Sequence, residues 1–117
     1  MEYVLLIYHN EEVARQRPEA EKQRIFQEFA EFTQDLTKSG KRKAGGPLDF
    51  TPRAATVRVR DGKTMVTDGP FAETKEQLGG YVLIEAKDLD EAISIAARIP
   101  SSKYGSTEVR AVMKMNM

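Results

Sequence analysis

The feature that most limits how this chain can fold is the apolar run near its start, residues 2–8, EYVLLIY. The run is rich in β-branched and aromatic residues and is too short for a helix, so we expect a strand. Side chains alternate across a strand, and here both sets are large and apolar: Tyr3, Leu5 and Ile7 on one face, Val4, Leu6 and Tyr8 on the other. We therefore expect this strand to be covered on both faces.

A long amphipathic helix is expected to cover one of these faces. Pro18 suits the first turn of a helix, and Gly40 is a natural stop. Between them, four apolar residues recur at the spacing of one helix face: Ile25, Phe29, Phe32 and Leu36. We interpret the Gly45-Gly46-Pro47 sequence that follows as a break in regular structure.

The second half of the chain predicts a hairpin, two further strands and a second helix. Residues 55–60 alternate with period two, and Asp61-Gly62 supplies the turn that closes the hairpin. Asp88 followed by Glu91 resembles a capping box and predicts the start of the second helix. The expected elements are strands over 2–8, 55–60, 63–67, 81–86 and 107–115 and helices between 18 and 40 and between 88 and 100.

This order of elements matches the split βαβ pattern of ferredoxin-like domains, an α+β fold with an antiparallel sheet, here formed as one domain over residues 1–117. Two helices cover one face of such a sheet and leave the other bare. Because strands 2–8 and 81–86 are apolar on both faces, a second copy of the chain is the simplest cover. We expect a homodimer in which two sheets face each other as a dimeric α+β barrel with a cavity between them.

The composition excludes several kinds of site and partner. The chain has no cysteine and one histidine, which rules out thiolate sites and multi-histidine metal cages within one subunit. Its 18 basic and 18 acidic residues cancel, so we expect neither nucleic acid nor a membrane as a partner. No dinucleotide fingerprint or phosphate-binding loop occurs, and we expect no cofactor and no bound metal. The first residues lack the basic flank of a signal peptide, which predicts a cytoplasmic protein.

Residues 68–86, DGPFAETKEQLGGYVLIEA, resemble the DGPF-type branch of the YCII-related family. The likeness continues through ATVRVRDG at 55–62 and EVRAV at 108–112 and covers nearly the whole chain. The resemblance implies a dimeric α+β barrel but no particular activity, since most DGPF-type members have no assigned function. More distant members are lyases in chlorinated aromatic ring-cleavage chemistry with a His-Asp pair as the suggested catalytic group. Ala20 stands where their histidine would lie.

Carboxylates are the first group of candidate site residues. Asp68 opens a Gly-Pro turn, and Glu73 follows it in the same segment. We interpret the two as acid or base candidates for proton transfer at the mouth of the cavity. The alternative for Asp68 is structural, because an aspartate in such a turn often accepts backbone N–H groups of its own loop.

Basic side chains form the second group. Arg58 and Arg110 alternate with apolar residues on two predicted strands, so we expect both to point into the dimer cavity and to bind an anion. The alternative is an ion pair with a nearby glutamate. Lys75 and His9 complete the expected ligand-binding set. We further expect Arg58, Asp68 and Arg110 to lie on one sheet and to border one shared cavity.

Two classes of function follow from these residues and from the resemblance. The first is a protein that binds a small anionic molecule in the dimer cavity, with lyase-like acid/base chemistry as its extension. The second is a non-catalytic sensor or interaction module linked to sigma-factor transcriptional regulation, since DGPF-type proteins resemble a group associated with extracytoplasmic sigma factors. The missing histidine favours the second class, and an enclosed cavity favours the first.

Overall fold

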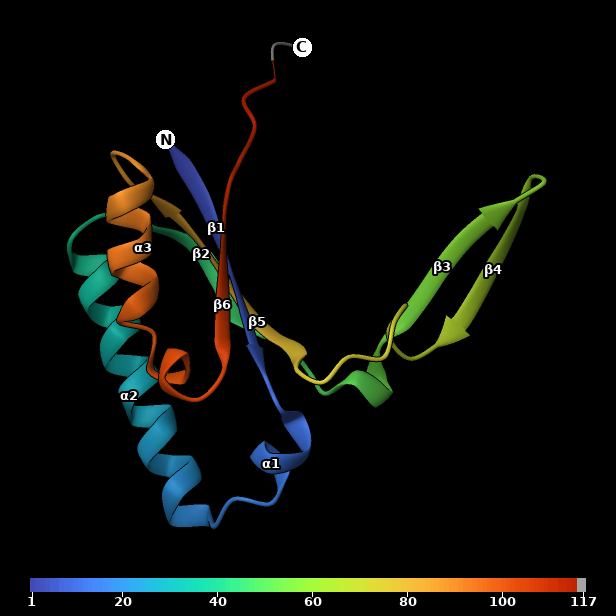
Figure 1. Ribbon diagram of the computed structural model, residues 1–117, viewed down its shortest axis with the longest axis horizontal. Coiled ribbons are helices and arrows are strands. Elements are labelled where there is room, and N and C mark those ends of the chain that lie inside the picture. The colour runs from blue at the N-terminus through green and yellow to red at the C-terminus, as the bar shows by residue number, and fades with distance from the viewer. Residues whose placement is uncertain (116–117) are drawn as a thin grey trace.

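A four-stranded antiparallel sheet forms the body of the protein, which the computed structural model describes over residues 1–115. The strands lie in the order β2-β5-β1-β6, so that β1 (Glu2–His9) is central and pairs with β5 and β6. The other strands are β2 (Arg42–Pro47), β5 (Gln77–Glu85) and β6 (Ser106–Ala111). Helices α2 (Glu19–Lys38) and α3 (Leu89–Ala97) cover one face of the sheet (Figure 1). This arrangement confirms the ferredoxin-like α+β fold that the order of elements predicts.

The core lies between the sheet and the two helices. Tyr3, Leu5 and Ile7 of β1 point towards the helices and are buried, as the alternation in residues 2–8 predicts. On α2, Phe32 and Leu36 are buried, whereas Phe29 of the same predicted stripe is only partly buried against the core. The first turn of α3 is capped by the Asp88 carboxylate, which accepts a hydrogen bond from the Glu91 N–H at 2.9 Å.

The glycine-rich stretch after α2 is a strand, and the prediction of a break there was wrong. Gly45, Gly46 and Pro47 belong to β2, which pairs with β5 at the edge of the sheet. A Cβ atom at Gly45 would lie 2.7 Å from the carbonyl oxygen of Tyr81, so glycine is what allows the two backbones to approach. Proline is tolerated at an edge because the free side of the strand needs no N–H donor.

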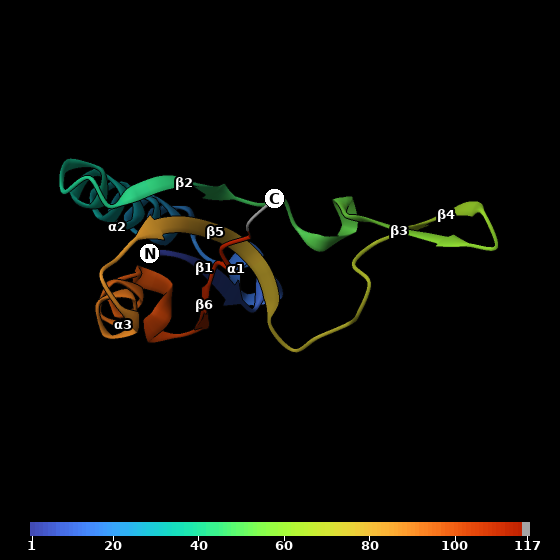
Figure 2. The same ribbon diagram turned by 90° about the horizontal axis from the view of Figure 1, so that it is seen from above.

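The predicted hairpin forms, but it does not join the central sheet. Within residues 1–115, strands β3 (Ala55–Arg60) and β4 (Lys63–Asp68) pair only with each other and project from the body as an arm, residues 55–68 (Figure 1, Figure 2). The turn at the tip has positive φ at Asp61 and Gly62, as a tight hairpin requires. The arm extends the molecule: the radius of gyration is 16.2 Å, against roughly 13 Å for a compact chain of this length.

Candidate functional site

The sheet face opposite the helices carries apolar side chains. Within residues 1–115 nothing packs over these side chains, and they are partly exposed to solvent. Residues paired across an antiparallel sheet point to the same side, so the strand register shows which side chains lie on this face. Val4 lies opposite Leu83 and Arg110, and Leu6 lies opposite Tyr81 and Glu108. We call this surface the open face; its members are Val4, Leu6, Tyr8, Leu78, Tyr81, Leu83, Glu108 and Arg110.

Arg110 lies on the open face, as the alternation of β6 predicts. Its guanidinium is exposed and forms an ion pair with Glu108, two residues earlier on the same strand. The hydrogen bond that Arg110 donates to the Glu108 carboxylate, together with the negative charge of that carboxylate, raises the pKa of Arg110 above its ordinary value. The ion pair that was the alternative interpretation is therefore present, and it forms on the face expected to receive a ligand.

Arg58 lies apart from Arg110, because β3 belongs to the arm. It is exposed and pairs with Met65 of β4 in the register of the arm. Its neighbours Val57 and Val59 are exposed as well and do not pack against the helices. The prediction that Arg58, Asp68 and Arg110 share one sheet was thus wrong, because the hairpin that carries the first two residues forms a separate two-stranded sheet.

The remaining predicted candidates follow each other at the base of the arm. Asp68 ends β4, and Glu73 and Lys75 lie in the segment that connects β4 to β5. All three are exposed. Because β5 begins at Gln77, opposite His9, this segment leads to the end of the open face at Tyr8 and Leu78.

A buried carboxylate that the sequence analysis missed lies at the same end of β1. Glu11, the first residue of α1 (Glu11–Arg15), is only 8% exposed. Its carboxylate accepts hydrogen bonds from the backbone N–H of Thr51, at 3.1 Å, and from the Thr51 hydroxyl. The Glu11 N–H donates to Oε1 of Gln77 at 3.0 Å. In the sequence, an acidic residue in the first turn of a helix indicates only a favourable interaction with the helix dipole, so nothing there signals burial.

His9, two residues before Glu11, packs against the backbone of Gly79. A Cβ atom at position 79 would lie 2.5 Å from Nε2 of His9, so a side chain there would collide with the imidazole ring. The pairing of β1 and β5 shifts register at this point, between Ile7 and Tyr8. Glycine at position 79 therefore allows both the bulge and the close approach of the imidazole.

Burial lowers the pKa of His9 below its ordinary value of 6.5, and the positive charge of Arg17 acts in the same direction. Glu11 and Glu76 partly oppose the shift. The folded protein therefore binds a proton at His9 more weakly than the unfolded chain does. Protonation of His9 should lower the free energy of unfolding as the pH falls through and below 6.5. The chain has one histidine, so a single imidazole signal in an NMR titration measures the effect directly.

We expect that imidazole signal to titrate below pH 6.5 in the folded protein and to return to the ordinary value in denaturant. In parallel, the stability of a His9→Asn variant should fall less than that of the unsubstituted protein between pH 7 and pH 5.5, a range chosen to lie above most carboxylate titrations. A folded-state pKa at or above 6.5 would contradict this account of the environment of His9.

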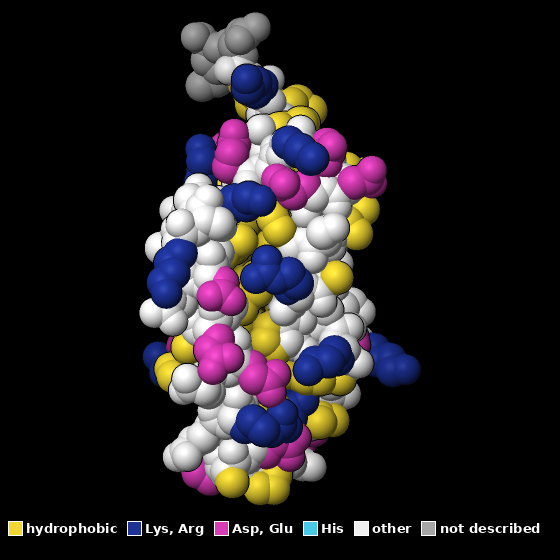
Figure 3. Space-filling model, turned by 90° about the vertical axis from the view of Figure 1, so that its left-hand side faces the viewer, with side chains coloured by type: hydrophobic (Ala, Val, Ile, Leu, Met, Phe, Trp, Pro, Cys, Tyr) yellow, Lys and Arg dark blue, Asp and Glu magenta, His cyan; other side chains and the backbone are white. Residues whose placement is uncertain are grey.

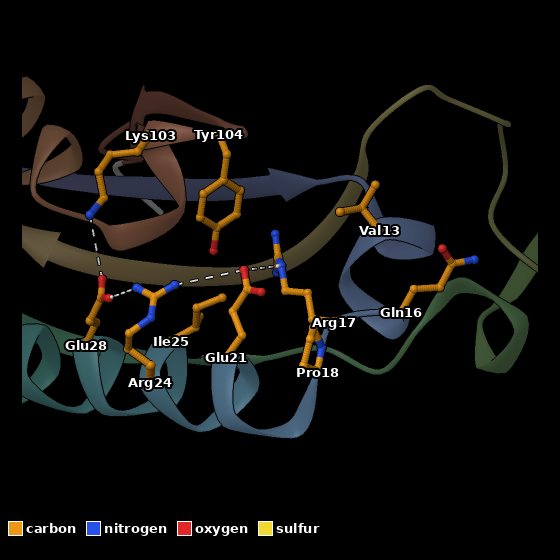
Figure 4. A pocket seen from close by; sticks show the side chains of 10 residues that line it. All are labelled: Val13, Gln16, Arg17, Pro18, Glu21, Arg24, Ile25, Glu28, Lys103 and Tyr104. Carbon is orange, nitrogen blue, oxygen red and sulfur yellow. Dashed lines mark hydrogen bonds and ion pairs between the residues drawn. The ribbon is translucent and has the colours of Figure 1, made fainter.

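A shallow pocket of about 610 Å³ lies beside α1 and the first half of α2, next to Tyr104 (Figure 4). Its lining contains none of the candidate residues predicted from the sequence. The acidic and basic side chains around it neutralise one another in ion pairs: Arg17–Glu21 at 3.7 Å, Arg24–Glu28 at 2.7 Å and Lys103–Glu28 at 3.7 Å. The Arg17 guanidinium also lies 4.6 Å from the centre of the Tyr104 ring. A charged ligand would have to displace these partners.

The surface on the helix side carries acidic and basic side chains intermixed, without a field of one sign (Figure 3). Across residues 1–115, no three His, Asp or Glu side chains gather closely enough to hold a metal ion. Helices of the length and apolar character required to span a membrane are not found in the described part of the chain. The open face and the base of the arm are therefore the surfaces on which a candidate site rests.

Comparison with known proteins finds a matching family, one protein of similar sequence and one solved structure of similar fold. A model of the YCII-related domain matches residues 1–116. An uncharacterized protein of Rhizobium meliloti (strain 1021) is 38% identical over 112 residues, which cover 94% of this chain and 90% of that protein. The solved structure of a 5-chloro-2-hydroxyhydroquinone dehydrochlorinase from Burkholderia phenoliruptrix AC1100, in complex with 2,5-dihydroxybenzoquinone, is 20% identical, with a TM-score of 0.49 over 97% of this chain and 94% of that one.

Proposed function

This chain belongs to the YCII-related domain family, and on that premise we propose that it works as a homodimer that binds a small anionic molecule between two facing sheets. The observation that carries the proposal is the open face, which joins six apolar side chains to one arginine. The turn at residues 68–71 further supports a place in the DGPF-type branch of the family.

The homodimer follows from the cost of leaving the open face in water. Val4, Leu6 and Leu83 are large apolar side chains that remain partly exposed in one chain. A second copy, related by a two-fold axis, would cover this face with the same surface and so satisfy both subunits at once. A stable interface of this kind buries about 1,200–2,000 Å² in total.

Arg110 is the proposed anchor for the ligand. A guanidinium that projects from an apolar face is well suited to bind a carboxylate or phosphate through two parallel hydrogen bonds. Its ion pair with Glu108 neutralises the arginine when no ligand is bound, and the ligand would compete with that glutamate. Tyr8 and Tyr81 add apolar rings with hydroxyl groups to the same face.

Acid or base chemistry is assigned to Asp68 or Glu73, with Lys75 and His9 as ligand contacts. The segment that carries Glu73 and Lys75 leads directly to Gln77, opposite His9, at one end of the open face. The lowered pKa of His9 keeps its imidazole uncharged near neutral pH, so it is able to accept a hydrogen bond or a proton there.

Arg110→Ala should weaken binding of an anionic ligand about 10- to 150-fold, the effect of losing one charge-assisted contact of roughly 1.5–3 kcal/mol. The measurement is the thermal shift produced by a panel of small carboxylates and phosphates, followed by calorimetry on any compound that binds. Arg98→Ala is the matched control, because Arg98 follows α3 and pairs with Asp35 on the helix side. Equal binding by Arg110→Ala and the unsubstituted protein would remove Arg110 from the site.

The second candidate function is a non-catalytic sensor or interaction module linked to sigma-factor regulation. The observation in its favour is the arm, whose exposed apolar residues are typical of a surface that contacts another macromolecule. Two results together would favour this function over ligand binding. No small molecule in the panel would stabilise the protein, and the arm would contact no second copy of the chain in the purified protein.

A further inference from the structure

The arm carries an apolar face that one chain leaves in water. Val57 and Val66 lie opposite each other in the register, and Val59 lies next to them on the same face. Their exposed fractions are 61%, 63% and 58%. An isolated two-stranded hairpin is at best marginally stable in water, because it has no second layer to pack against. This arm therefore needs a surface that covers its valines.

The arm does not reach its own body, because its base is fastened. The Glu11 carboxylate holds Thr51, the first residue of the short 3₁₀ helix η1 (Thr51–Arg53) that precedes the arm. The Leu48 N–H donates to the carbonyl of Gly79 at 2.9 Å. At the root of the hairpin, the Gly69 N–H donates to the carbonyl of Ala54 at 2.7 Å. These bonds hold the arm pointing away from the four-stranded sheet.

We propose that the arm packs against a second copy of this chain and lies along the base of the arm of that copy. This inference rests on the proposed homodimer. Figure 1 shows the arm and the helices on opposite sides of the sheet, so the arm extends on the side where the partner is proposed to sit. Under two-fold symmetry each arm then meets the partner, and both sets of valines are covered together.

The receiving surface is the apolar rim at the base of the arm. Leu48 and Phe50 precede the arm in the chain, Phe71 follows it, and all three are exposed. In a two-fold arrangement with the two arms antiparallel, the tip of each arm lies near the base of the other. The exposed valines would then pack on these larger side chains, a contact that the single chain cannot make.

Dissociation of the dimer gives the first test. Val66→Glu, on the apolar face of the arm, should raise the dissociation constant about tenfold or more in sedimentation velocity. Thr67→Glu, one position along on the opposite face, is the control and should change it little. If the unsubstituted protein is a monomer at micromolar concentration, the proposed homodimer itself is wrong. If it is a dimer and Val66→Glu dissociates no more readily than Thr67→Glu, only the arm contact is wrong.

Cross-linking between chains gives the second test, and the absence of native cysteine makes it free of background. Val59→Cys protein is mixed with Phe71→Cys protein and treated with a short bismaleimide, so every mixed product joins two chains. We expect a mixed cross-link for this pair and none when Val59→Cys is mixed with Ile93→Cys, an exposed position on α3. Equal cross-linking of both mixtures, or cross-linking of neither, would overturn the proposal even where the glutamate variant fails to fold.

Discussion

Phe32→Ala is expected to lower the free energy of unfolding by about 3–5 kcal/mol, since truncation removes buried apolar contacts and leaves a cavity. Phe32 is 7% exposed and packs between α2 and the sheet. Phe26 lies on the same helix with 74% of its surface exposed and supplies the matched control. Phe26→Ala should change the stability by no more than about 0.5 kcal/mol.

Urea unfolding measures both variants, at one fixed protein concentration because the stability of a homodimer depends on concentration. Similar losses for the two variants would mean that α2 presents a different face to the sheet. The same comparison tests the buried part of the helix stripe, since Phe29, in the middle of the stripe, is only partly buried.

Leu6→Glu should convert the homodimer to a monomer. Leu6 lies on the open face between Tyr81 and Glu108, so the substitution would place a second carboxylate beside Glu108 in an apolar interface. Burial of a carboxylate without a partner costs several kcal/mol, which is a large part of the binding free energy of a dimer.

Leu89→Glu is the control for this substitution, because Leu89 is an exposed residue at the start of α3 on the helix side. It should leave the assembly unchanged. Circular dichroism would show that both variants keep their secondary structure. A Leu6→Glu protein that remains dimeric at micromolar concentration would place the interface elsewhere.

The parts of the fold that sequence reasoning predicted are those set by local periodicity. The patterns that predict strand β1, helix α2 and the cap of α3 each lie within the residues of that element or next to it. Strand β2 was missed because its glycines have low strand propensity, and only the backbone of β5 explains why small residues lie there. The hairpin was found, but alternation alone does not say which sheet a hairpin joins.

The same distinction separates the site residues. The orientation of Arg110 follows from alternation along β6, and the sequence alone predicted it. Arg58 follows the same rule on β3, but its strand lies in the arm, so its surroundings differ. Glu11 was missed because its burial depends on Thr51, a residue distant in the sequence. No local pattern contains that contact.

The mass of the protein in solution tests the central claim most directly, because both the ligand cavity and the arm contact require a second copy of the chain. Light scattering coupled to size-exclusion chromatography at micromolar concentration should give a mass twice the 13.2 kDa of the single chain. A mass of 13.2 kDa under the same conditions would contradict the account.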